Sequence, residues 1–451
     1  MLKRILFFVL FIISSLSFSQ NYSLIGVIEN YTNSKLYLAD FYGDQKNIVD
    51  STMSDKTGKF EFTFSDKMPI GQYRILLTAQ NFIDVIFNKE NIQFITSGLS
   101  PNEDIKIISS NENRLYYAYI YQRNMCQFKT DILSDLVNYY PEHGDFYLTA
   151  KNEYISIQKK FSDFVDDLIK NKPESFVTRI ATFERKPYLN PDLSAAERQL
   201  YTKSHFFDNI NFNDTLLLHS NVISSKIVSY LSFYQNKSFT KEQLENSFIQ
   251  AVDTLMLKAF DNEKVYEFVV EYLIKGFDSF GFNKVILHIA EYSGLGEKCV
   301  NKKRKSELGK RIEGLKKMAI GNQAPEIIAS DINGNKVILS EIKKENTLVI
   351  FWSSSCPHCT KFLPRLKNIY NNNKSNFEII AISLDTSQTA YMDNINKNKY
   401  NWINVCDFIG WDTKPAKDYS VYATPIMYLL DKNNKIIGQP SSVGEVKESI
   451  K

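Results

Sequence analysis

The sequence predicts a multidomain protein with a small all-β N-terminal domain, an all-α middle domain and a C-terminal α/β domain. The chain has 451 residues, roughly the length of three domains, and 43% of them are hydrophobic, which suffices for several cores. Short alternating runs dominate residues 20–108, and apolar stripes with helical spacing dominate residues 109–300. Strand-like and helical segments alternate in residues 319–451, as in βαβ units around a sheet.

The first 19 residues have the pattern of a secretory signal peptide. Lys3 and Arg4 supply the positive start, an unbroken apolar run follows, and Ser17 and Ser19 fit a small-x-small cleavage site. The apolar run is shorter than the ~20 residues that span a membrane, and an uncleaved N-terminal anchor is the alternative. The sequence therefore predicts a protein of the periplasm or another extracytoplasmic compartment.

Residues 20–108 are predicted to form a β-sandwich-like domain. Short runs in which apolar and polar residues alternate are typical of strands, and turn-forming segments such as Asp55–Gly58 and Pro69–Gly71 separate them. The predicted strands cover residues 22–28, 35–42, 59–64 and 72–77. The region contains no histidine and no cysteine, so it offers no obvious chemistry.

Residues 109–300 are predicted to be helical. Leu115, Tyr116 and Tyr119 belong to an apolar stripe with helical spacing, and Thr240 with Gln243 forms a capping box at a helix start. Such tyrosine and phenylalanine stripes usually line helix interfaces, so we interpret them as core and not as a cofactor site.

Residues 301–318 are predicted to form a basic helical linker. Eight lysines and arginines lie there, with Glu307 and Glu313 between them. A patch for acidic partners or anionic lipid is one interpretation, but isolated basic runs are usually solvated helix faces, which we favour. Over the whole chain 54 basic residues nearly balance 51 acidic ones, so we expect no nucleic-acid partner.

The chemistry of the sequence is concentrated in one stretch of the C-terminal domain. A β-prone run ends at Trp352, three serines follow, and Cys356 and Cys359 then open a helical pattern. Two thiols at this spacing close a small disulfide ring, and a helix N-terminus stabilises a thiolate. The pattern predicts thiol–disulfide exchange. A zinc site would need a second pair of ligands, and His288, Cys299 and Cys406 show no such spacing.

With these residues, the region from Gly321 to Lys451 resembles the TlpA/ResA group of thioredoxin-like thiol–disulfide oxidoreductases. Further matching motifs are Gly321–Pro325, Leu339–Ile342, Pro364, Trp411–Asp412 with Tyr419, and Ala423–Pro425. The resemblance implies a thioredoxin-like fold and a cis peptide bond between Thr424 and Pro425 that faces the cysteines. We expect no cofactor and no metal. The β and α regions before it resemble, by layout, extensions of secreted bacterial relatives.

Thiol chemistry and the resemblance together assign the site residues. Cys356 is the nucleophile that attacks a substrate disulfide, and Cys359 resolves the mixed disulfide, so the oxidised form holds a Cys356–Cys359 disulfide. Pro357 and His358 tune the redox properties, because an imidazolium next to the thiolate favours the reduced form. The substrate-binding set comprises Trp352, Thr424 and Pro425.

The direction of the reaction is the open question at this point. Thioredoxins carry a buried aspartate where this sequence has Ile350, and many ResA-like reductases carry a glutamate where it has Phe362. The Pro357-His358 dipeptide also occurs in the oxidase DsbA. Family placement favours a reductase of extracytoplasmic proteins. The alternatives are a DsbA-like dithiol oxidase, a peroxiredoxin-like peroxidase with Ser353 at the threonine position, and a ligand- or partner-binding protein that uses the fold as a scaffold.

The expected partners are cysteine-containing protein substrates and a membrane electron-transfer protein. The other thiols, Cys126, Cys299 and Cys406, are expected to be packed apolar groups, although Cys406 ends a strand of the redox domain and an additional exchange role is the alternative.

Overall fold

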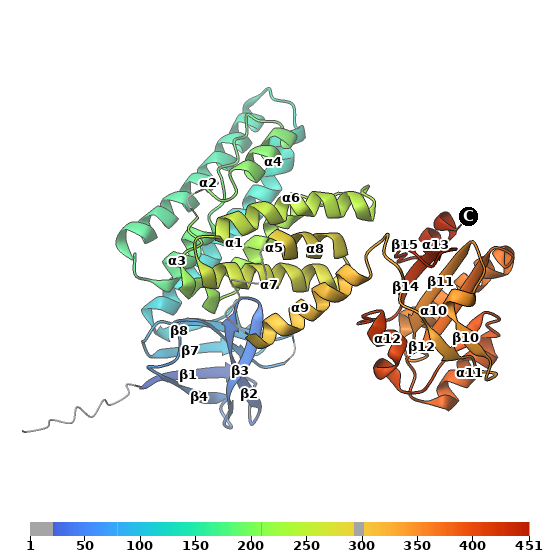
Figure 1. Ribbon diagram of the computed structural model, residues 1–451. Helices are drawn as coiled ribbons and strands as arrows, with labels where there is room; N and C mark the ends of the chain where they lie inside the picture. Colours follow the sequence, from blue (N-terminus) through green and yellow to red (C-terminus); the bar gives the residue numbers. More distant parts are fainter. Residues whose placement is uncertain (1–20, 79, 209, 293–301, 451) are drawn as a thin grey trace, which may run out of the picture. The chain divides into compact units, whose positions relative to one another are not determined.

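The structure of the protein is a computed structural model that describes residues 21–78, 80–208, 210–292 and 302–450 (Figure 1). The predicted signal peptide, residues 1–19, and Cys299 lie outside the described residues. The chain divides into two compact units, Met1–Gly276 and Phe277–Lys451. Within the described ranges, no helix combines the length and the apolar character that a membrane span needs.

Two four-stranded sheets form the N-terminal part of the first unit. One has the order β4 (Lys59–Ser65), β1 (Asn21–Glu29), β7 (Ile92–Ser97), β8 (Lys106–Ser109), and the other β3 (Gln45–Met53), β2 (Lys35–Tyr42), β5 (Gly71–Leu76), β6 (Phe82–Phe87). Side chains from both sheets share one core, so the predicted all-β region is confirmed. The predicted runs did not include β3, β6, β7 or β8, and in β3 nearly all side chains are exposed, which leaves no alternation to detect.

A tight turn connects β2 to β3 and contacts the helical part. Gly43 has a φ of 62°, a region that L side chains rarely adopt. Its N–H donates to the carbonyl of Leu218 at 2.7 Å. A Cβ at Gly43 would lie 2.0 Å from the Phe268 ring, so only glycine fits between this turn and that side chain.

The helical part of the first unit follows β8 directly, and the predicted all-α middle region is confirmed. Its helices are α1 (Asn111–Tyr139), α2 (Asp145–Asn171), α3 (Phe176–Glu184), α4 (Ala195–Ser204), α5 (Val222–Ser232), α6 (Lys241–Ala259) and α7 (Glu263–Ser279). The capping box of Thr240 and Gln243 is present at the start of α6. Tyr116 and Tyr119 are buried on α1, as their spacing predicts.

The first turn of α1 is bonded to the β-sandwich and to α3. The Asn113 side chain accepts from the Ile86 N–H and donates to the Ile86 carbonyl, both at 2.8 Å, as a neighbouring strand would. Glu112 accepts from the Val177 N–H at the start of α3 and from the Ser175 hydroxyl, each at 2.8 Å. Both side chains are buried, so these bonds are protected from water.

The second unit contains the C-terminal α/β domain. Its five-stranded sheet has the order β13 (Ile403–Val405), β12 (Phe377–Ser383), β11 (Asn346–Trp352), β14 (Ile426–Asp431), β15 (Ile436–Gly438). The helices are α10 (Pro357–Asn373), α11 (Gln388–Asn398), α12 (Lys414–Asp418) and α13 (Val443–Ser449), and a hairpin of β9 (Ile328–Ser330) and β10 (Lys336–Ile338) precedes them. Separate hydrophobic clusters cover the two faces of the sheet. The predicted order of strands and helices is confirmed.

The helices α8 (Asn283–Tyr292) and α9 (Lys302–Lys317) precede this domain in the second unit. The predicted basic linker is helical, but its second half is not fully solvated. Arg311 pairs with Asp278 at 2.7 Å and stacks 3.5 Å above the Tyr422 ring. Ile312 and Leu315 are buried. The domain boundaries at residues 300 and 318 remain a prediction.

Candidate active site

The strand β11 positions the two cysteines. All seven of its residues are buried, and it lies in the middle of the sheet, parallel to β12 and antiparallel to β14. Ser353–Ser355 leave the carboxyl end of this strand, and α10 begins at Pro357. Proline is favoured in the first helical turn because the missing N–H has no helical partner there. The rigid strand therefore delivers Cys356 to a helix N-terminus.

Cys356 is the N-cap residue of α10. Its Sγ accepts a hydrogen bond from the Cys359 N–H at 3.2 Å. The Sγ also lies 3.4 Å from the carbonyl oxygen of Thr424, in the loop that contains the cis Thr424–Pro425 peptide bond. The predicted cis bond facing the cysteines is thus confirmed. Cys356 is only half-buried, so a substrate sulfur has access to it.

The two thiols differ strongly in acidity. Burial alone would raise the pKa of Cys356, but hydrogen bonds from the Cys359 thiol, the Thr424 side chain and nearby backbone N–H groups outweigh it and lower the pKa. The Cys359 side chain is fully buried, and this burial, with the hydrogen bond to Cys356, raises its pKa to about 12. One accessible thiol is therefore prone to ionise, and one buried thiol stays protonated. Both are free thiols in the structure, so the predicted disulfide stays a prediction.

The residues between the cysteines are exposed. The backbone N–H of His358 helps lower the pKa of Cys356. In the described part of the chain, the imidazole of His358 makes no hydrogen bond or ion pair. Pro357 is exposed on the first turn of α10. The structure thus places both residues beside the nucleophile, and their role in redox tuning stays a prediction.

The prediction that the Trp352 side chain contacts the substrate does not agree with its position in the structure. Its side chain is fully buried and packs with Tyr391 and Tyr400, at ring centroid distances of 6.0 and 6.3 Å. A side chain without exposed surface has none to offer a substrate, so Trp352 is a core residue. Thr424 and Pro425, by contrast, are half-buried and lie beside Cys356.

A buried carboxylate that the sequence did not reveal lies under the serine loop. Asp385 is 6% exposed and accepts hydrogen bonds from the hydroxyls of Ser353 and Ser354, both at 2.8 Å. It also accepts from the Ser354 N–H at 3.0 Å and the Ser383 hydroxyl at 2.6 Å. The available clue was its position just after β12, because the carboxyl ends of parallel strands meet at one edge of a sheet.

Asp385 lies at neither of the two positions where related proteins carry an acid, which are Ile350 and Phe362 in this chain. Ile350 is buried within β11 and Phe362 packs partly against the core, so both positions serve apolar packing. Asp385 instead fixes the loop that leads to Cys356. The backbone of Ser353 in turn forms a hydrogen bond that favours the thiolate of Cys359. We therefore regard Asp385 as a positioning residue of the site.

The remaining described thiols show no redox pairing. Cys406 is half-buried, burial raises its pKa, and its Sγ donates to the Asp385 carbonyl at 3.6 Å. Burial also raises the pKa of Cys126, in the first unit. Within the residues that the structure describes, no group of three or more His, Cys, Asp or Glu side chains converges as a metal site would require.

Comparison with known proteins agrees with this geometry. A family profile described as Thioredoxin-like matches residues 345–436. The thiol-disulfide oxidoreductase ResA of a Bacillus cereus strain is 30% identical over 122 residues, which cover 27% of this chain and 69% of that protein. The chain belongs to the ResA-like thiol–disulfide oxidoreductases. This oxidoreductase is also 27% identical over 125 residues to ResA of Bacillus subtilis (strain 168), covering 28% and 68% of the two chains.

A solved structure of a thiol-disulfide oxidoreductase from Bacteroides fragilis NCTC 9343 is 32% identical to this oxidoreductase. It covers 28% of this chain and 98% of that chain, with a TM-score of 0.26. A second family profile, described as a domain of unknown function (DUF5106), matches residues 187–317. The ResA-like part of the chain, matched by the first profile, is the C-terminal domain, and the second profile matches part of the helical region before it.

Proposed function

We propose that this oxidoreductase is exported and reduces disulfides of extracytoplasmic proteins through the dithiol of Cys356-Pro357-His358-Cys359. The observation that carries the exchange chemistry is the opposite shift of the two thiol pKa values, and the likeness to ResA favours the reducing direction. A lowered pKa increases the fraction of Cys356 that is present as the thiolate, the form that attacks a disulfide. A pKa of about 12 keeps Cys359 protonated until Cys356 is engaged.

The first step is a thiolate–disulfide exchange. The Cys356 thiolate attacks one sulfur of a substrate disulfide, the substrate S–S bond breaks, and a mixed disulfide forms. The other substrate sulfur leaves as a thiolate and takes a proton from solvent. The carbonyl of Thr424, close to the Cys356 sulfur, is placed to accept a backbone N–H of an extended substrate segment.

The second step resolves the mixed disulfide. Once the charge on Cys356 is gone, Cys359 loses its proton, and its thiolate attacks the Cys356 sulfur. The Cys356–Cys359 disulfide forms and the second substrate sulfur leaves as a thiolate. The substrate has gained two electrons, and the enzyme has lost two. A membrane electron-transfer protein that reduces the enzyme disulfide would complete each cycle.

Export rests on the basic start, the short apolar run and the Ser17-x-Ser19 site at the N-terminus. The pattern predicts cleavage before Gln20. N-terminal sequencing of protein recovered from the periplasm tests this directly. A protein that stays in the cytoplasm with Met1 intact would refute export.

The reducing direction is tested by the reduction potential of the Cys356–Cys359 couple. Equilibration with glutathione or dithiothreitol buffers measures it, and a value near ~−270 mV indicates a reductase. A stabilised thiolate raises the potential, so a value near ~−120 mV would instead identify an oxidase.

The roles of the cysteines are tested by insulin reduction and by trapping. Cys356→Ser should abolish turnover, and Cys359→Ser should accumulate mixed disulfides with substrate because the resolving thiol is missing. Cys126→Ser, which removes a thiol in the other unit, is the matched control and should keep full activity. Unchanged turnover of Cys356→Ser would refute the mechanism.

A further inference from the structure

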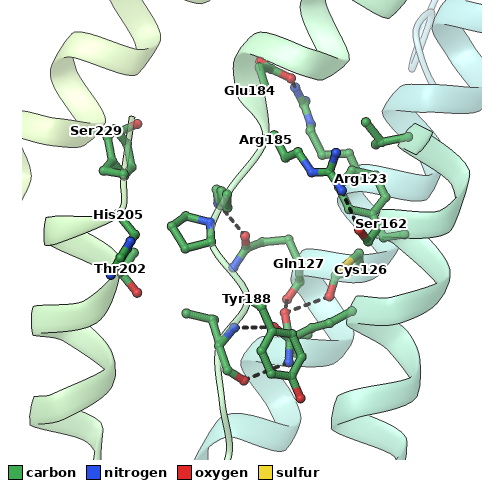
Figure 2. Close-up of a pocket in the computed structure, with 18 of the residues that line it drawn as sticks. Arg123, Cys126, Gln127, Ser162, Glu184, Arg185, Tyr188, Thr202, His205 and Ser229 are labelled. Carbon is green, nitrogen blue, oxygen red and sulfur yellow. Dashed lines mark hydrogen bonds and ion pairs between the residues drawn. The ribbon is translucent and has the colours of Figure 1, made fainter. Parts of the chain in front are cut away.

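A large cavity lies in the helical part of the first unit, far along the sequence from the two cysteines. Its volume is about 1180 Å³, and α1, α2, α4, α5 and the segment 184–189 line it. Ligand pockets usually measure ~300–1,000 Å³, so a small molecule fits easily. Figure 2 shows the segment 184–189 with Arg123, Gln127 and Ser162 on one side and Thr202, His205 and Ser229 on the other.

Two of the arginines around this cavity are already neutralised. Arg123 pairs with Glu184 at 2.8 Å, and the Tyr119 hydroxyl donates to the same carboxylate at 2.6 Å. Arg185 pairs with Asp166 at 2.7 Å. These groups satisfy one another and leave no net charge for a ligand.

Two lysines of the lining have no such partner. Lys226 on α5 is 5% exposed, and its Nζ donates to the Arg185 carbonyl at 2.9 Å and lies 4.3 Å above the Phe206 ring. The Lys186 Nζ donates to the Gln127 side chain at 2.7 Å. Among the described residues, no carboxylate lies within 4.0 Å of either ammonium group.

The lack of a carboxylate partner matters most for Lys226, because this side chain is buried. An ammonium group has three donors and is costly to bury without an opposite charge. Burial lowers the pKa of Lys226, the charge of Glu184 partly opposes this shift and the charge of Lys186 adds to it, so that the pKa is about 8. An anion beside Lys226 would satisfy the donors that the protein leaves open.

The rest of the lining is largely aromatic and apolar. Phe206 and Phe233 line the cavity from the side of α4 and α5, and Tyr188 lines it from the segment 184–189. Aromatic walls favour flat ring systems, which stack on them. A ligand that matches this lining has an anionic group and an apolar body.

We propose that this cavity binds a small aromatic carboxylate, with its carboxylate at Lys226 and Lys186 and its ring system against the aromatic wall. The site belongs to the region without assigned role and does not depend on thiol chemistry. It gives this part of the chain a ligand-binding function beside the disulfide exchange of the C-terminal domain.

The test compares two fluorescent probes on the full-length protein. 4-(1-Pyrenyl)butyrate carries the carboxylate, and 4-(1-pyrenyl)butanol has the same ring system without the charge. We expect saturable binding of the butyrate, at least tenfold tighter than the butanol. No saturable binding, or equal affinity for the two probes, would overturn the proposal.

The variant Lys226→Gln should abolish this preference for the butyrate. Its amide keeps a donor for the Arg185 carbonyl, so the local fold has its bond. Lys186→Gln, at an exposed side chain, should reduce the preference and serves if Lys226→Gln fails to fold. A preference that survives in both variants would overturn the proposal.

The matched control is Lys203→Gln. Lys203 lies on α4, 3.5 Å above the Tyr234 ring, and burial lowers its pKa too, but it does not line the cavity. This variant should keep the tenfold preference. If it loses the preference as Lys226→Gln does, the effect reflects overall charge and the proposal fails.

Discussion

The variant Asp385→Asn tests whether the buried carboxylate holds the active-site loop. Four donors converge on Asp385: the hydroxyls of Ser353, Ser354 and Ser383 and the N–H of Ser354. Asparagine keeps the shape and volume of the side chain but removes the charge and replaces one acceptor oxygen with a donor. The change therefore isolates the hydrogen-bonding role.

The magnitude follows from which donors the amide can still satisfy. Serine hydroxyls rotate and can accept from the new NH₂ group, but the N–H of Ser354 can only donate. Its partner is lost or shared, and a buried donor left without a partner costs about 1–3 kcal/mol. With a urea dependence of ~2 kcal/mol/M, the unfolding midpoint should fall by ~0.5–1.5 M.

Tryptophan fluorescence makes the assay specific for the second unit. The chain has three tryptophans, Trp352, Trp402 and Trp411, and all lie in the C-terminal domain. Urea unfolding of the reduced full-length protein, followed at these residues, therefore reports this domain. Asp393→Asn, an exposed position on α11, removes the same charge and should change the free energy of unfolding by less than ~0.5 kcal/mol.

A kinetic readout separates loop positioning from simple stability. A displaced Ser353 no longer supports the Cys359 thiolate, so Asp385→Asn should resolve mixed disulfides several-fold more slowly in the absence of urea. The reasoning is refuted if the variant keeps the wild-type midpoint and the wild-type resolution rate. It is also refuted if Asp393→Asn shows losses of the same size.

Three further outcomes follow from the structure. Because the pKa of Cys356 is lowered, its alkylation by iodoacetamide should reach the plateau rate at lower pH than for a free cysteine; a profile centred above ~8.5 would contradict this. Gly43→Ala should destabilise the first unit by about 2–4 kcal/mol in thermal unfolding followed by circular dichroism, because the φ is positive and the Cβ meets Phe268. Arg311→Ala should cost about 1–3 kcal/mol in urea unfolding followed at the tryptophans, since it loses a partly buried ion pair and the stacking on Tyr422; an unchanged midpoint would show that α9 is not docked.

The sequence predicted the parts of the fold and the site that local patterns encode. The order of strands and helices in the C-terminal domain and the helix start at Cys356 follow from patterns along the chain, and the cis Thr424–Pro425 bond follows from the family resemblance. Asp385 was missed because its partners Ser353 and Ser354 meet it only when β11 and β12 pair. The cavity was not predicted for the same reason, because the segments that line it meet only in the folded chain.

One prediction was wrong and another was incomplete, because sequence proximity is not spatial proximity. Trp352 precedes the cysteines by a few residues, but as the last residue of a fully buried strand it faces the core. The tyrosine stripe of α1 is core, as predicted, yet Tyr119 also borders a cavity that the segment 184–189 helps to line. Neither the burial of Trp352 nor the cavity beside Tyr119 produces a periodic pattern in the sequence.

The hydrogen bonds of Glu112 and Asn113 mean that the sandwich and the helices of the first unit cannot be studied as two separate fragments. Both residues belong to α1. Asn113 bonds to Ile86 as a further strand of the sandwich would, and Glu112 accepts from the Val177 N–H in the first turn of α3. Cutting the chain between residues 108 and 109 would leave buried polar groups on both fragments without hydrogen-bond partners. The sandwich and the helices should therefore unfold in one transition, and proteases should release neither as a stable fragment.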